Sequence, residues 1–72
     1  MSRNLKVGIA VFNLSAKYSF DRFGLITKVL QNDSYRVKFT KILRKGTHNV
    51  FFLTINGQFL IKKDEASELL FG

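Results

Sequence analysis

Apolar and polar residues alternate with a period of two over short stretches of this chain, and this alternation limits the fold more than any other sequence feature. The clearest stretch is residues 35–40, in which Tyr35, Val37 and Phe39 occupy every second position and polar residues lie between them. Such alternation is typical of a strand with one buried face. Together with the turn signals, it predicts antiparallel strands at residues 5–12, 23–30, 35–40, 50–55 and 58–62.

Turn and loop residues separate these predicted strands. Residues 13–22 are polar and irregular, which predicts a long loop, and residues 31–34 (Gln-Asn-Asp-Ser) predict a turn that joins two strands into a hairpin. Gly24 marks either a bulge or a close approach of two backbones. In the first strand, the side chains expected to share one face are Leu5, Val7, Ile9 and Val11.

The dipeptide Asn56-Gly57 lies between two apolar runs, which is the strongest short signal for a hairpin with a type I′ turn. That turn would place Leu53 opposite Leu60 and leave both faces of the hairpin apolar. We therefore expect a cover on both faces, from the C-terminal segment or from a partner surface. The C-terminal segment predicts a short helix over about 64–70, with Asp64 as its N-cap.

Length and charge define the class of protein. The chain has 72 residues and no Cys, with 12 Lys and Arg against 5 Asp and Glu, a formal net charge of +7. We expect a single domain over residues 1–72 and exclude disordered, collagen-like and disulfide-framework classes. The sequence shows no secretory signal and no apolar stretch long enough to span a membrane. These features predict an intracellular, cytoplasmic protein without membrane contacts.

The chain offers little catalytic chemistry. His48 is the single His, and no nucleophile elbow, phosphate-binding loop or dinucleotide motif is present. Asp64 and Glu68 lie one helical turn apart and could hold a metal, but an acidic start of a helix explains them better. We expect a protein that is not an enzyme and that uses no cofactor and no metal.

Basic residues gather in the middle of the chain, where six lie within residues 28–45 and only Asp33 opposes them. Such clustering attracts phosphate groups, and exposed aromatic side chains beside it could stack on unpaired bases. The Phe residues are expected mainly in the core, whereas Tyr18 and Phe20 are expected at the surface of the long loop. The candidate nucleic-acid-binding residues are Lys28, Arg36, Lys38, Lys41, Arg44, Lys45, Arg22 and Tyr18.

Residues 23–30 (FGLITKVL) and 32–39 (NDSYRVKF) resemble the Gly-x-(Ile/Val)-x-x-Val, turn, Tyr-x-Val-x-Phe hairpin of SH3-like barrels, including the KOW-type group associated with nucleic acids. This resemblance implies a bent five-stranded sheet with functional loops at one rim. The very apolar residues 51–61 depart from that pattern. The expected fold is mainly β: a small, strongly bent antiparallel SH3-like barrel of four to five strands with a short C-terminal helix.

Three functions agree with these features. The first is a small basic protein that binds RNA or DNA through phosphate contacts from the basic strand and loop. The second is a regulator of the kind that phages and mobile elements encode, which binds a larger host protein of the transcription or translation machinery. Its contact surface would be the apolar C-terminal hairpin, through Phe51, Leu53, Ile55 and Leu60. The third is self-assembly into a homo-oligomer through the same hairpin.

Overall fold

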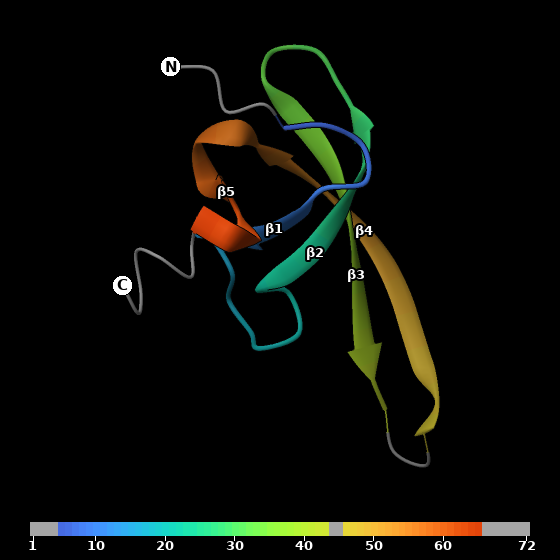
Figure 1. Cartoon of the computed structure of the whole chain (residues 1–72). Helices are drawn as coiled ribbons and strands as arrows, with labels where there is room; N and C mark the ends of the chain where they lie inside the picture. Colours follow the sequence, from blue (N-terminus) through green and yellow to red (C-terminus); the bar gives the residue numbers. More distant parts are fainter. Residues whose placement is uncertain (1–4, 44–45, 66–72) are drawn as a thin grey trace.

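The computed structural model describes residues 5–43 and 46–65, which form one five-stranded antiparallel sheet (Figure 1). Its strands lie in the order β4-β3-β2-β1-β5. The mainly β, antiparallel prediction is confirmed. The two edge strands, β4 and β5, do not pair with each other, so the sheet is not closed into a barrel. The strands are β1 (Ala10–Asn13), β2 (Phe23–Val29), β3 (Ser34–Ile42), β4 (His48–Asn56) and β5 (Leu60–Lys62), with a 3₁₀ turn, η2 (Gly57–Phe59), before β5.

One face of the sheet, here called the inner face, carries the core. Val37 and Phe39 of β3 point to this face, while Arg36 and Lys38 point to the opposite, outer face. Alternation along each strand sends one apolar set inward, and burial of each such side chain contributes about 1.5–3 kcal/mol. The buried apolar side chains are Leu5, Val11, Ile26, Val37, Phe39, Ile55 and Leu60.

The first predicted strand is shorter than expected because its alternation breaks at Gly8. Gly8 has a φ of +92°, and Val7 before it is 62% exposed, so the prediction that Val7 shares the buried face is wrong. Residues near Gly8 still follow β2: the Gly8 N–H donates to the Ile26 carbonyl (2.8 Å), and the Ile26 N–H donates to the Ile9 carbonyl (3.0 Å). A positive φ reverses the side-chain direction that strict alternation assumes.

The hairpin of β2 and β3 is confirmed. Asn32 and Asp33 both have positive φ (58° and 57°), the condition for a type I′ turn, and the Ser34 N–H donates to the Gln31 carbonyl at 3.2 Å. The register then shifts between Ile26 and Lys28, which marks a bulge in β2. The local increase of twist that a bulge produces bends the sheet at this point.

The predicted hairpin across Asn56-Gly57 is wrong. β4 pairs along its whole length with β3, and β5 pairs with β1. Asn56 adopts an extended conformation (φ −70°, ψ 142°), and its side-chain oxygen accepts a hydrogen bond from the Gln58 N–H at 3.0 Å. Gly57 serves close packing: its N–H donates to the Asp33 carbonyl (2.6 Å), and a Cβ there would lie 2.5 Å from Asp33 Oδ1.

A helical segment begins at Lys63 and is described as far as Glu65. Its start agrees with the predicted helix within one residue, but Asp64 lies in the first turn rather than at the cap. Residues 66–70, including Glu68, lie outside the described residues.

Candidate nucleic-acid interface

Three of the predicted binding residues lie together on the outer face of the sheet. Arg36 of β3 is in register with Lys28 of β2 on one side and with Thr54 of β4 on the other. Lys38 follows two residues later and therefore points to the same face. We call this surface, formed by Lys28, Arg36 and Lys38, the outer basic face.

The outer basic face carries three positive charges. Lys28 and Arg36 are exposed and Lys38 is half-buried, and within the described part of the chain none of the three forms an ion pair with a carboxylate. Asp33, the nearest acid in the sequence, accepts a hydrogen bond from the Tyr35 hydroxyl at 3.0 Å. Like charges this close create a local positive potential that favours anionic ligands.

Exposed apolar side chains flank these cations. Lys38 lies in register between Leu25 of β2 and Phe52 of β4, and Phe52 is 52% exposed.

The expectation that the Phe residues lie mainly in the core is wrong for Phe23, Phe52 and Phe59, which are all exposed. The sheet is a single layer, so Phe51 and Phe52, as consecutive strand residues, point to opposite faces and only the inner side chain gains cover.

A hollow of about 340 Å³ opens on the outer face where β1, β2 and β3 adjoin. Phe23 and Leu25 contribute to its apolar lining, and Lys38 and Lys63 also line it. The Lys63 Nζ lies 5.7 Å from the centre of the Phe23 ring. The sequence alone did not indicate Lys63 as a site residue, because its position beside Phe23 depends on the pairing of β5 with β1.

The long loop between β1 and β2 is built on two buried polar residues. The Asp21 carboxylate accepts hydrogen bonds from the N–H groups of Lys17 (3.2 Å) and Tyr18 (2.9 Å). The Asn13 side-chain amide donates to the Asp21 carbonyl (3.0 Å) and accepts from the N–H of Ser15 (3.0 Å). These bonds fix the loop so that Tyr18 is 60% exposed, as the sequence predicted.

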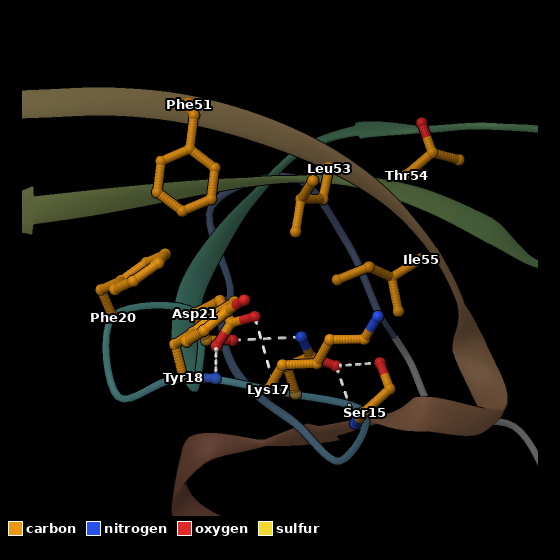
Figure 2. Close-up of a pocket in the computed structure, with 10 residues that line it drawn as sticks. Ser15, Lys17, Tyr18, Phe20, Asp21, Phe51, Leu53, Thr54 and Ile55 are labelled. Atoms are coloured by element: carbon orange, nitrogen blue, oxygen red, sulfur yellow. Dashed lines mark hydrogen bonds between the residues drawn. The ribbon is translucent and has the colours of Figure 1, made fainter.

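A second pocket, of about 440 Å³, lies between this loop and the inner face of β4 (Figure 2). Tyr18 stacks on Phe20 with ring centres 5.1 Å apart, and the Phe20 and Phe51 rings pack edge to face with centres 5.6 Å apart. The Lys41 Nζ lies 4.7 Å from the centre of the Phe20 ring. Lys41 therefore belongs to the inner side of the sheet, and the structure separates it from the outer basic face.

The remaining predicted site residues are spread over the chain. Arg22 is exposed at the end of the β1–β2 loop, and Arg44 and Lys45 lie outside the described residues. Phe51 and Leu53 line the inner pocket and are partly accessible. Ile55 and Leu60 are buried in the core, so the prediction that they offer a surface to a partner is wrong.

Comparison with known proteins gave no match among protein-family models, curated proteins or solved structures. Among the described residues, no cluster of three or more His, Cys, Asp or Glu side chains could hold a metal ion. The same residues contain no helix that is long and apolar enough to cross a membrane.

Proposed function

We propose that this protein binds nucleic acid, RNA or DNA, through the outer basic face. One observation carries the proposal: Lys28 and Arg36 are register partners on adjacent strands, Lys38 extends the group along β3, and no ion pair with a carboxylate of residues 5–43 or 46–65 involves any of the three. The strands fix the backbone positions from which these side chains extend, about 5 Å apart across the sheet and about 7 Å apart along β3. Phosphate groups of a nucleic-acid backbone suit such an array, and the counterions that they release drive binding.

The proposal includes the fold family. We infer that the sheet is of the SH3-like small-barrel type, in the KOW-type group associated with nucleic acids. The confirmed β2–β3 hairpin supports it, because this hairpin contains the residues that carry the resemblance. The bulge in β2 and the position of β5 beside β1 also agree with a bent five-stranded sheet.

The test is a double substitution, Arg36→Ala with Lys38→Ala, measured by fluorescence anisotropy with a labelled oligonucleotide at several salt concentrations. Removal of two phosphate contacts should make the slope of log K against log salt shallower by about 1.4 for a single strand or about 1.8 for a duplex. The matched control is Lys17→Ala with Lys41→Ala. It removes the same charge from the inner side and should change the slope much less.

Two outcomes would contradict the proposal. Equal slopes for the outer double variant and the wild type would show that Arg36 and Lys38 make no phosphate contacts. Equal losses from the outer and inner double variants would show that the attraction depends on net charge rather than on the outer basic face. Thermal melting of each variant confirms that the fold is retained, since all four side chains lie outside the buried core.

The inner pocket favours a second candidate function, the binding of a larger host protein. Leu53 is 40% exposed and Tyr18 is 60% exposed, and both side chains line the pocket. Together they present apolar surface to solvent. A partner would bury this surface, and Leu53→Asp should then abolish the complex while Phe59→Asp, at another exposed site, leaves it intact. Loss of binding in both variants, or in neither, would argue against this pocket.

A further inference from the structure

We infer that the ligand of the outer basic face is a single strand, with one unpaired base stacked on Phe52 and phosphates of the same strand held by Lys38 and Lys63. This inference rests on the proposed function and adds the class of nucleic acid. It commits to an unpaired strand, of RNA or DNA, because both offer the same base faces and phosphates.

Phe52 has the properties of a stacking platform. Its side chain is 52% exposed at the centre of β4, and no other aromatic ring or cation of the described residues packs on it. Register places it directly opposite Lys38, whose cation is flexible enough to contact the phosphate of a stacked nucleotide. Stacking of a base on an aromatic side chain contributes affinity without regard to sequence, because every base has an aromatic face.

The hollow beside β1 continues this surface. Lys38 lines the hollow from β3, and Lys63 lines it from the opposite side, next to Phe23. Phe52 on β4 and Leu25 on β2 are separated by two strand spacings, about 10 Å. About three stacked nucleotides, at about 3.4 Å each, cover that distance. A strand that begins on Phe52 can therefore place a phosphate between Lys38 and Lys63.

The exposed apolar surface distinguishes a single strand from a duplex. Phosphates of either form could contact the cations, but in a duplex each base is stacked between its neighbours and presents only its edge. The ring of Phe52 would then stay exposed to water. An unpaired base covers it and thus uses both the charge and the aromatic surface of the outer face.

The experiment compares three labelled probes in anisotropy titrations: twelve-nucleotide oligothymidine, the same backbone with abasic spacers, and a twelve-base-pair duplex. Phe52→Leu removes the ring and keeps an apolar side chain. It should weaken oligothymidine binding about 5- to 150-fold, the range expected for one lost stack, and should leave the abasic and duplex probes unchanged. The matched control, Phe59→Leu, changes another exposed Phe, on η2, and should have no effect.

Lys63→Ala and Phe52→Trp give independent readouts. Lys63→Ala should weaken oligothymidine and the abasic probe equally, because it removes only a phosphate contact. The chain has no Trp, so Phe52→Trp supplies a single fluorescent reporter, whose emission should be quenched by oligothymidine but not by the abasic probe.

Equal wild-type affinity for oligothymidine and the abasic probe would overturn the single-strand inference, as would a Phe52→Trp variant that binds oligothymidine without quenching. Tighter binding of the duplex would do the same. In each of these cases the salt slope of the Arg36 and Lys38 double variant still decides the proposed function. Failure of the inference can therefore be distinguished from failure of the proposal.

Discussion

Replacement of Gly24 by Ala tests how closely β2 packs on the inner face. A Cβ at this position would lie 2.5 Å from Val37 Cγ1, 2.8 Å from the Lys38 carbonyl oxygen and 2.8 Å from Phe39 Cε1. Two of these atoms belong to core side chains, and the third is a backbone oxygen. Relief of all three contacts requires the strands to separate, because the carbonyl oxygen cannot move without its strand.

The expected cost follows from these contacts. Overpacking of a core by one methyl group costs about 1–3 kcal/mol, and a contact with backbone points to the upper part of that range. The gain from a less flexible unfolded chain offsets about 0.4–1 kcal/mol. We therefore expect Gly24→Ala to lower the free energy of unfolding by about 2 kcal/mol, which corresponds to a fall in Tm of about 8–16 °C for a domain of this size.

Circular dichroism measures this effect by thermal and urea unfolding. A double-mutant cycle supplies the control, since Val37→Ala removes the nearest clashing atom and should recover part of the loss in the Gly24→Ala background. The reasoning is refuted if Gly24→Ala melts within about 2 °C of the wild type, a change well under 1 kcal/mol. Additive single and double effects would show that Gly24 and Val37 do not touch.

Two further changes test other parts of the fold. Leu60→Ala should lower the free energy of unfolding by about 2–5 kcal/mol in urea titrations, because Leu60 is fully buried; a change below 1 kcal/mol would place β5 outside the core. Asp21→Ala removes the acceptor of two backbone N–H groups in the β1–β2 loop and should cost about 1–3 kcal/mol. Faster amide hydrogen exchange at Lys17 and Tyr18 should accompany that loss, and unchanged exchange would contradict the assigned bonds.

The local sequence pattern was enough to predict the β2–β3 hairpin in the middle of the sheet. The alternation over residues 35–40 requires a half-buried strand, and the turn at 31–34 fixes its partner within a few residues along the chain. Of the two alternatives predicted for Gly24, a bulge or a close backbone approach, the structure shows the close approach, to the Lys38 carbonyl oxygen, whereas the bulge lies between Ile26 and Lys28. Each of these features depends on residues near one another in the sequence, where strand periodicity and turn preferences act directly.

The prediction of a hairpin across Asn56-Gly57 was wrong because this dipeptide is compatible with two local structures. Asn56-Gly57 favours a type I′ turn, but Asn also caps a 3₁₀ turn and Gly also permits a close backbone approach. β4 pairs with β3 over nine register positions, and the extended Asn56 with the 3₁₀ turn after it replaces the tight turn that would have brought β5 onto the free edge of β4. β5 is then free to close against β1, and only this distant pairing brings Lys63 beside Phe23.

In the candidate site, too, positions within one strand could be predicted from the sequence, whereas positions that depend on the pairing of distant strands could not. Arg36 and Lys38 could be placed on one face from alternation alone, because they belong to a single strand. Phe52 could not, since its face depends on which strand β4 pairs with and in which register. The predicted hairpin, with Leu53 opposite Leu60, would place Phe52 opposite Ile61, whereas in the structure Phe52 lies opposite Lys38. That change turns an apolar pair into an aromatic ring beside a cation, the combination from which we infer binding of an unpaired base.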